Sequence, residues 1–236
     1  MCPRNGSNGD AVLLEVIACS RIDAIEAQRG GAGRLEIVRE LGKGGLTPAV
    51  DLVRRILDAV AIPVRVMIRE ADGFEAGDER AVARLAAQAR EIAALGVDGI
   101  VVGFLRGGRI HCTAMNAVLA AAAPVRATFH HAFDDLPDRI DVMRELARWP
   151  AIDRVLTAGG DGDWNRKAAA LAALVRESTQ GIGILAGGGV DARALRILAR
   201  AGIAEAHVGR AAREPATHDG VVSARRVADL VEASRS

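Results

Sequence analysis

The chain alternates short apolar runs with longer amphipathic stretches in which apolar residues recur every three or four positions. Short apolar runs are typical of buried strands, and the longer period is typical of helices that cover a sheet. The alternation repeats eight times and predicts eight βα units around a parallel sheet. The expected strands cover residues 12–18, 34–38, 64–69, 99–105, 127–134, 154–157, 181–186 and 205–209.

Local signals at the ends of the amphipathic stretches support the same division. Ser20-Arg21-Ile22-Asp23 has the spacing of a capping box, and Gly30-Gly31 is expected to end the helix that it opens. Thr47-Pro48 predicts an N-cap followed by a first-turn proline. The expected helices cover residues 21–29, 48–59, 79–95, 114–122, 137–148, 166–177, 192–201 and 223–233.

A single closed barrel is the simplest architecture for eight such units. No linker, low-complexity tract or change of composition separates them, and a closed barrel leaves no exposed sheet edge. An open doubly wound sheet is the alternative, but its dinucleotide form needs GxGxxG after the first strand, where this chain has Cys19-Ser20-Arg21. We therefore predict a flexible segment over residues 1–11 and a TIM-type (β/α)8 barrel over residues 12–236.

The composition of the chain argues against several classes of protein. A length of 236 residues with 50% hydrophobic composition suits one sizeable domain. Lys+Arg 31 against Asp+Glu 30 gives a formal charge of +1, so no general attraction to nucleic acid or anionic membrane is expected, and the predicted partner is a small molecule or metal ion. Three cysteines without CxxC spacing predict neither a disulfide scaffold nor a thiolate zinc site. Without a signal peptide or a membrane-length apolar run, a cytoplasmic protein is expected.

Ionisable residues at the ends of the expected strands are the candidates for chemistry. The βα loops of a barrel converge at the carboxyl ends of its strands. Glu15 and Glu36 each lie within an apolar run, where a buried carboxylate needs a partner or a raised pKa. An ion pair with an arginine on a neighbouring strand is the structural alternative for Glu15. The candidate catalytic residues are Glu15, Glu36, Arg69, His130, Asp134 and Thr157.

The histidines divide by strand alternation. Successive side chains of a strand point to opposite faces, so Thr128 and His130 share one face while Phe129 and His131 share the other. We expect His130 to face the barrel interior and His131 to pack toward the helices. His111 and His218 are expected in surface loops, and a hydrogen-bonded core histidine is the simpler interpretation of His207.

Glycines after the last two expected strands predict an anion site. In eight-stranded barrels, backbone N–H groups and a short helix N-terminus at this place often hold a phosphate. Glycines also make tight βα turns without any ligand, which is the structural alternative. The candidate anion-binding residues are Gly187, Gly188, Gly189, Gly209 and Arg210.

A series of short motifs runs in order through nearly the whole chain from about residue 12: Leu14-Glu15-Val16, Gly31-Ala32-Gly33-Arg34-Leu35-Glu36, Gly44-Gly45-Leu46-Thr47-Pro48, Val66-Met67-Ile68-Arg69, Thr128-Phe129-His130, Ala132-Phe133-Asp134, Arg154-Val155-Leu156-Thr157, Gly187-Gly188-Gly189 and Glu205-Ala206-His207. In these motifs the sequence resembles the CutC family, which is named for copper homeostasis. The resemblance implies a TIM barrel, a cytoplasmic homo-oligomer with a dimer favoured, and copper binding or trafficking. By motif match it also implies a pocket of Glu15, Glu36, Arg69, His130, Asp134, Thr157 and His207.

The chain departs from the family pattern where copper is concerned. Family members proposed to bind Cu(I) carry cysteines at the positions of Ile17 and Val38, and aliphatic side chains cannot replace a thiolate. The family usually has arginine at the position of His131. A harder divalent ion or Cu(II) fits nitrogen and oxygen ligands instead, and the candidate metal ligands are Glu15, Glu36, His130 and His207. The alternative function is an enzyme acting on a small anionic or phosphorylated substrate with strand-end Glu, His and Arg residues.

Overall fold

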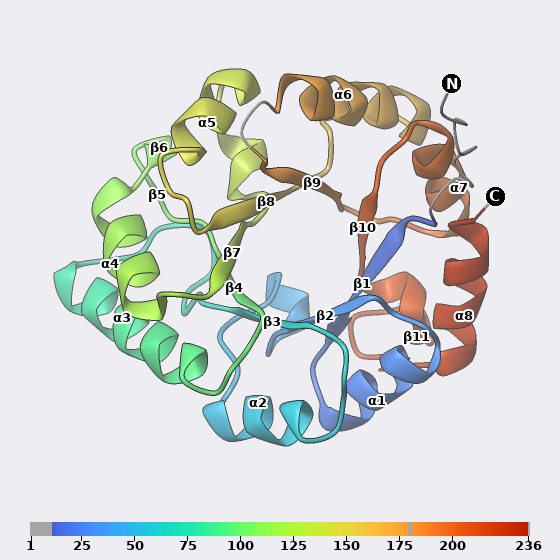
Figure 1. Ribbon diagram of the computed structural model, residues 1–236, viewed down its shortest axis with the longest axis horizontal. Coiled ribbons are helices and arrows are strands. Elements are labelled where there is room, and N and C mark those ends of the chain that lie inside the picture. Colours follow the sequence, from blue (N-terminus) through green and yellow to red (C-terminus); the bar gives the residue numbers. More distant parts are fainter. Residues whose placement is uncertain (1–10, 179–180, 236) are drawn as a thin grey trace, which may run out of the picture.

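Eight parallel strands close into a barrel in the computed structural model, which describes residues 11–178 and 181–235. Residues 1–10 of the segment predicted to be flexible lie outside the described residues. The ring order is β1-β10-β9-β8-β7-β4-β3-β2, so chain neighbours are also neighbours in the ring and the predicted (β/α)8 barrel is confirmed (Figure 1). The barrel strands are β1 (Leu13–Ala18), β2 (Arg34–Ile37), β3 (Val64–Met67), β4 (Gly99–Val102), β7 (Arg126–Phe129), β8 (Ile152–Thr157), β9 (Gly183–Ala186) and β10 (Glu205–Val208).

Helices surround this ring on the outside (Figure 1). Ser20 caps the first of them by accepting a hydrogen bond from the Asp23 amide at 3.0 Å, as the capping box predicts. Among the described residues no helix has the length and apolar character needed to cross a membrane. The helices are α1 (Arg21–Arg29), α2 (Val50–Leu57), α3 (Glu79–Ala93), α4 (Cys112–Ala122), α5 (Arg139–Leu146), α6 (Trp164–Glu177), α7 (Ala192–Arg200) and α8 (Ala224–Ala233).

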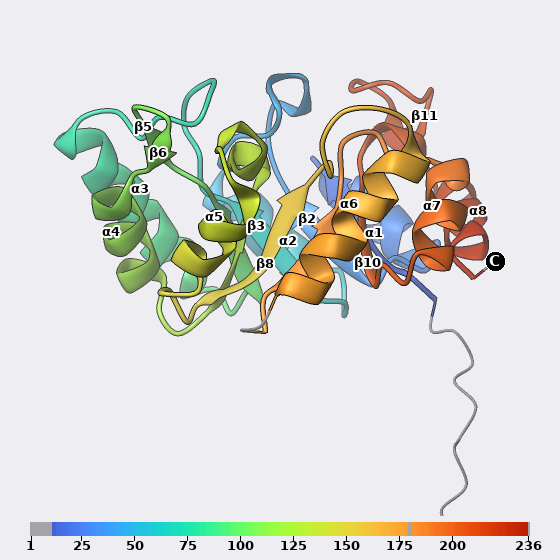
Figure 2. The same cartoon turned by 90° about the horizontal axis from the view of Figure 1, so that it is seen from above.

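Two small hairpins lie at one end of the barrel (Figure 2). The strand predicted over 99–105 ends at Val102, and its remainder forms the hairpin of β5 (Leu105–Arg106) and β6 (Arg109–Ile110). Gly107 and Gly108 both have positive φ and make the predicted tight turn. The second hairpin consists of β11 (Arg213–Glu214) and β12 (Val221–Val222), which follow β10.

Two predicted boundaries are wrong in ways that shape the site. Thr47 is not an N-cap, since α2 begins after Ala49 and the Thr47 hydroxyl instead bonds the backbone of Arg69. The run over 127–134 is a strand only to Phe129, after which the chain turns into the 3₁₀ helix η2 (His131–Asp135). The alternation of side chains between the two faces of the strand therefore does not extend to His131.

Buried ion pairs fill the amino-terminal half of the barrel interior. Arg34 contacts Glu15 on the neighbouring strand and Glu205 at 2.6 Å, and Arg154 donates to the same Glu205 at 2.7 Å. Glu15 is 1% exposed, so the arginine supplies the charge that its burial requires. This is the ion pair that the sequence suggested as the structural alternative for Glu15.

Arg65, on β3 beside β2, extends the same network toward β7 and β8. Its guanidinium makes two bonds to Asp153, at 2.6 and 2.7 Å, and donates to the Thr128 hydroxyl at 2.8 Å. Thr128 therefore faces the interior, as alternation predicts. Nearer the carboxyl ends of the strands lies a small apolar cluster, which consists of Ile17, Val38, Met67 and Val101.

Candidate functional site

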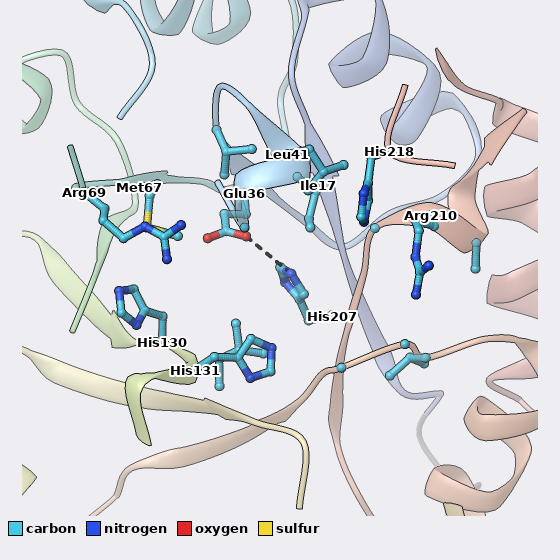
Figure 3. A pocket seen from close by; sticks show the side chains of 18 of the residues that line it. Ile17, Glu36, Leu41, Met67, Arg69, His130, His131, His207, Arg210 and His218 are labelled. Carbon is cyan, nitrogen blue, oxygen red and sulfur yellow. Dashed lines mark ion pairs between the residues drawn. The ribbon is translucent and has the colours of Figure 1, made fainter. Parts of the chain in front are cut away.

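A cavity of about 470 Å³ opens at the carboxyl end of the barrel (Figure 3). Its volume lies in the range of sites for small organic ligands. Most of the predicted site residues line it: Glu36, Arg69, His130, His207, Gly188, Gly189, Gly209 and Arg210. The other four predicted residues do not line it: Glu15, Asp134, Thr157 and Gly187.

Glu36 and His207 form the polar centre of the cavity. Glu36 Oε2 lies 3.4 Å from His207 Nε2, and Figure 3 shows this contact as the ion pair between the drawn side chains. Glu36 Oε1 is buried without a hydrogen-bond partner. His207 Nδ1 lies 2.8 Å from Glu15 Oε1, so Glu15 orients the ring from behind. The pair thus presents a free carboxylate oxygen and one edge of an oriented imidazole to the cavity.

The two glutamates have opposite electrostatic surroundings. Burial raises the pKa of Glu36 to about 7, with a further increase from Glu15 that the positive charges of His207, Arg69 and Arg34 only partly offset. Burial also raises the pKa of Glu15, but Arg34 and the bond to His207 outweigh it and lower that pKa to about 2. Burial lowers the pKa of His207, yet the negative charges of Glu36 and Glu15 raise it above its usual value. Glu15 is therefore a fixed anion, and Glu36 is the carboxyl that can exchange a proton near neutral pH.

Arg69 lies on the wall of the cavity beyond the end of β3. Its backbone is fixed by Thr47, whose hydroxyl donates to the Arg69 carbonyl at 3.0 Å and accepts from the Arg69 amide at 2.8 Å. The guanidinium lies 5.7 Å from the ring centroid of Phe74 and donates through Nη2 to the Lys43 carbonyl, while Nε is buried without a partner. Burial lowers the pKa of Arg69. Arg69 is thus a buried cation with donor capacity left over.

His130 follows β7 and is 2% exposed. Its Nδ1 accepts a hydrogen bond from the Ala132 amide at 3.1 Å, which leaves the proton of the neutral ring on Nε2, and Nε2 has no partner. Burial, together with the charges of Arg69 and His131, lowers the pKa of His130 to about 3. His130 is therefore a neutral hydrogen-bond donor at physiological pH.

The neutral state of His130 predicts a pH dependence of stability. Between about pH 6.5 and pH 3 the unfolded chain binds a proton at this residue that the folded chain does not, so the free energy of unfolding should fall as pH falls. In His130→Gln this contribution is absent. The free energy of unfolding, measured with urea between about pH 6 and pH 4.5, should then depend on pH with a slope that is smaller by the equivalent of about one bound proton. Equal slopes for the two proteins would contradict the assignment, because all other titrating groups are common to both.

His131 also lines the cavity, which corrects the expectation that it packs toward the helices. Its Nδ1 lies 2.9 Å from Asp134 Oδ2, and Asp134 accepts hydrogen bonds from the Thr157 hydroxyl and from the Ala158 amide at 3.0 Å. Burial raises the pKa of Asp134, but these hydrogen bonds outweigh it and lower the pKa below its usual value. Asp134 and Thr157 are thus placed to orient His131, and they reach the cavity only through it.

The loop of three glycines after β9, Gly187 to Gly189, only partly faces the cavity. Gly188 and Gly189 line the cavity, while the Gly187 amide donates to the Thr157 carbonyl at 2.9 Å and holds β8 and β9 together. A Cβ at Gly187 would lie 2.5 Å from Leu156, so this position requires the close approach that glycine permits. Asp191 caps α7 by accepting from the Ala194 amide at 2.8 Å, which places a carboxylate at the predicted anion site.

Three of the predicted metal ligands come together in the described part of the chain. Glu15, Glu36 and His207 each offer an atom within 4.8 Å of the others, and His130 is outside this group. Glu15 is already bonded through both oxygens, to His207 and Arg34. Glu36 Oε2 and His207 Nε2 lie 3.4 Å apart. Two ligands about 2.1 Å from one ion lie about 3.0 Å apart in a square-planar site and about 3.4 Å apart in a tetrahedral one, so only a small shift of either side chain separates this pair from square-planar geometry. The residues present therefore fit an ion held by these two side chains.

Several residues that line the cavity were not predicted from the sequence. His131, which was expected to pack toward the helices, shares the cavity with His130 and His207. His218 is an exposed loop residue, as expected, and it also lines the cavity. Phe74, in the loop after β3, also lines it. The buried ion pairs could have been predicted from the sequence. Arg34 lies two residues before Glu36, and Glu205 lies two residues before His207, so each shares the inward face of its strand with the later residue. No comparable signal marked Phe74 or His218 as cavity residues.

Comparison with known proteins identifies relatives along nearly the whole described barrel. The sequence model of the CutC family matches residues 12–212. The family protein CutC of Salmonella schwarzengrund is 33% identical over 196 residues, covering 83% of this chain and 78% of that protein. The copper homeostasis protein cutC homolog of Mus musculus is 34% identical over 201 residues, covering 84% and 74%.

Solved structures with a similar fold include a protein that carries the same family name. A Streptococcus agalactiae protein assigned as copper homeostasis protein CutC is 25% identical with a TM-score of 0.76, covering 84% of this chain and 98% of that one. Orotidine 5'-phosphate decarboxylase of Pyrococcus horikoshii is 15% identical with a TM-score of 0.63, covering 94% and 99%. The second likeness shows a shared barrel fold only.

Proposed function

Because this chain belongs to the CutC family, we propose that it acts in copper homeostasis by binding a copper ion in the barrel cavity. Glu36 and His207 are the proposed ligands. The observation that carries the proposal is the unpartnered, buried Glu36 Oε1 beside an imidazole that Glu15 orients through its other nitrogen. An imidazole that donates its second N–H to a carboxylate is the usual arrangement of a metal-binding histidine.

The donor set favours Cu(II) over a thiolate-bound Cu(I). Ile17 and Val38, at the positions where the resemblance expected cysteines, belong to the apolar cluster with Met67 and Val101. Cys19 lies nearby, but burial raises the pKa of its thiol, and its sulfur accepts a hydrogen bond from Arg213 at 3.5 Å. Thiolates and thioethers select Cu(I), whereas nitrogen and oxygen donors suit Cu(II). The Met67 thioether lines the cavity but packs in the apolar cluster, and the proposed ligands are the Glu36 carboxylate and the His207 imidazole. One copper ion per chain, held by nitrogen and oxygen, is the proposed stoichiometry.

A Cu(II) titration of protein purified without a histidine tag tests the proposal. We expect saturation at one Cu(II) per chain by calorimetry, and an electron paramagnetic resonance spectrum with hyperfine coupling to nitrogen. Cu(I), measured by competition with a chromogenic chelator, should bind more weakly than Cu(II). Saturation only at several ions per chain, or a spectrum without nitrogen coupling, would contradict a site built on His207.

The size of the cavity supports a second candidate function, an enzyme acting on a small anionic molecule. A volume of about 470 Å³ exceeds what a single ion needs. Glu36, with its pKa raised to about 7 by burial, has the protonation behaviour of a general acid or base at neutral pH. Native mass spectrometry of the purified protein tests this candidate, because a retained organic ligand supports it and a mass matching the bare chain or the chain plus copper does not.

A further inference from the structure

We propose that Arg69, His130 and Phe74 form a subsite for the oxyanion of a small molecule, a carboxylate or a phosphate. We call this group of three residues the Arg69 subsite. All three line the cavity, and Figure 3 shows Arg69 and His130 on the same side of it, away from Arg210. The inference depends on neither copper binding nor turnover.

The charge of Arg69 is the first observation. The side chain is 7% exposed. Within residues 11–178 and 181–235 no carboxylate forms an ion pair with its guanidinium, and the charges of Asp72 and Glu36, which raise its pKa, do not offset the effect of burial. Each of the other arginines of the barrel interior, Arg34, Arg65 and Arg154, has an acidic partner. A buried cation without a counter-ion is costly. The unpartnered Nε, within the cavity wall, marks where an anion would supply the missing charge.

His130 is the second observation, and it does not depend on the first. Its Nε2–H is buried without an acceptor, while Nδ1 is held by the Ala132 amide. A Cβ at Gly103 would lie 2.5 Å from the imidazole ring, so the ring packs directly on the backbone of β4's end and cannot turn freely. A fixed neutral donor adds a hydrogen bond to an anionic oxygen without adding a second buried charge.

Phe74 joins the two donors. Its ring centroid lies 5.7 Å from the Arg69 guanidinium carbon and 5.0 Å from the His130 ring centroid. The aromatic face stabilises the guanidinium and limits the access of water to it. Both donors therefore lie against one apolar ring, and this arrangement strengthens any hydrogen bond that they make to a ligand.

The glycine loop across the cavity is the weaker anion site. The carboxylate of Asp191 already occupies the N-terminus of α7, and it would repel a second anion there. Arg210 is exposed, so its charge is solvated. In the described part of the chain the Arg69 guanidinium has no ion-pair partner, and Asp72 and Glu36 act on it only without direct contact. The glycine loop instead has the Asp191 carboxylate directly at the N-terminus of its helix.

Calorimetry on copper-free protein at pH 7.5, with inorganic phosphate and separately with malonate, tests the subsite. We expect at least one of the two anions to bind at one per chain, and which of them binds distinguishes a phosphate from a carboxylate. Arg69→Met should weaken that binding at least about tenfold, and Arg69→Lys should weaken it less because it keeps the charge. His130→Leu should weaken it more than His130→Gln, which keeps an N–H donor.

Two arginine variants provide the controls. Arg106→Met changes an exposed residue of the β5–β6 hairpin and should leave anion binding unchanged. If Arg210→Met abolishes binding while Arg69→Met does not, the anion binds at the glycine loop and the proposal is overturned. Absence of binding by both anions at about 10 mM also overturns it, provided that thermal unfolding shows the protein to be folded. If the protein binds no copper but still binds the anion, the proposed copper function is contradicted and the Arg69 subsite is still supported.

Discussion

Replacing Arg34 by methionine is expected to lower the free energy of unfolding by about 3–5 kcal/mol. Arg34 is 3% exposed and contacts both Glu15 and Glu205. Without it, Glu15, which is 1% exposed, keeps only His207 as a partner, and a buried carboxylate without its counter-ion is strongly destabilising. Urea unfolding followed by circular dichroism at pH 7 measures the change.

Two further variants separate charge burial from the loss of a side chain. Arg29→Met removes an exposed arginine that pairs with Glu26 on the surface of α1, and it should cost less than about 1 kcal/mol. Glu15→Gln combined with Arg34→Met should be more stable than Arg34→Met alone, because the uncompensated charge is then absent. A loss of under 1 kcal/mol for Arg34→Met would mean that water reaches Glu15 and that the interior ion pairs contribute little.

The barrel could be predicted from the sequence because its signal is repeated. Eight alternations of short apolar runs with amphipathic stretches each require a buried strand and a helix that covers it, and only ring closure leaves no edge. An error at one boundary changes little in such a pattern. The helix expected to begin at Thr47-Pro48 begins at Val50, yet α2 still covers the same part of the barrel.

The depth of each strand-end residue could not be predicted, because it depends on the stagger between strands. Glu15 pairs in register with Arg34 and with His207, whereas Glu36 pairs with Ile17, two residues further along β1. Glu15 therefore lies one layer below Glu36 and reaches the cavity only through His207. The alternation of a single strand shows which face a residue occupies but not how deep it lies in a closed barrel.

The position of His131 was also beyond the local pattern. The alternation that places Thr128 and His130 on the inner face holds through β7 and fails where η2 begins. A 3₁₀ turn advances about three residues per turn, so two consecutive histidines can both reach one cavity. Asp134, three residues after His131, is the only local sign of this turn, since it lies where it can bond the imidazole.

Replacing either proposed copper ligand should have the largest effect on binding. Glu36→Gln keeps the shape of the side chain but removes its charge, and His207→Gln removes the imidazole. Each is expected to weaken Cu(II) binding by more than about 100-fold, because loss of a ligand should exceed the 10- to 100-fold loss typical of an outer hydrogen-bond partner. Glu15→Gln, which alters only the orientation of His207, should fall within that lower range. Competition with a Cu(II) chelator of known affinity measures all three.

A histidine outside the cavity supplies the matched control for these variants. His111 precedes α4 and is not among the residues that line the cavity, so His111→Gln should bind Cu(II) as the unchanged protein does. The order of the four variants is as informative as the size of each effect. The loss of Cu(II) affinity should be largest for the His207 and Glu36 variants, smaller for Glu15→Gln and absent for His111→Gln. If His111→Gln weakens binding as much as His207→Gln, copper binds at surface imidazoles and the cavity is not its site. If Glu36→Gln and His207→Gln both retain full affinity, the pair has another role, and proton exchange at Glu36 becomes the better explanation of its free oxygen.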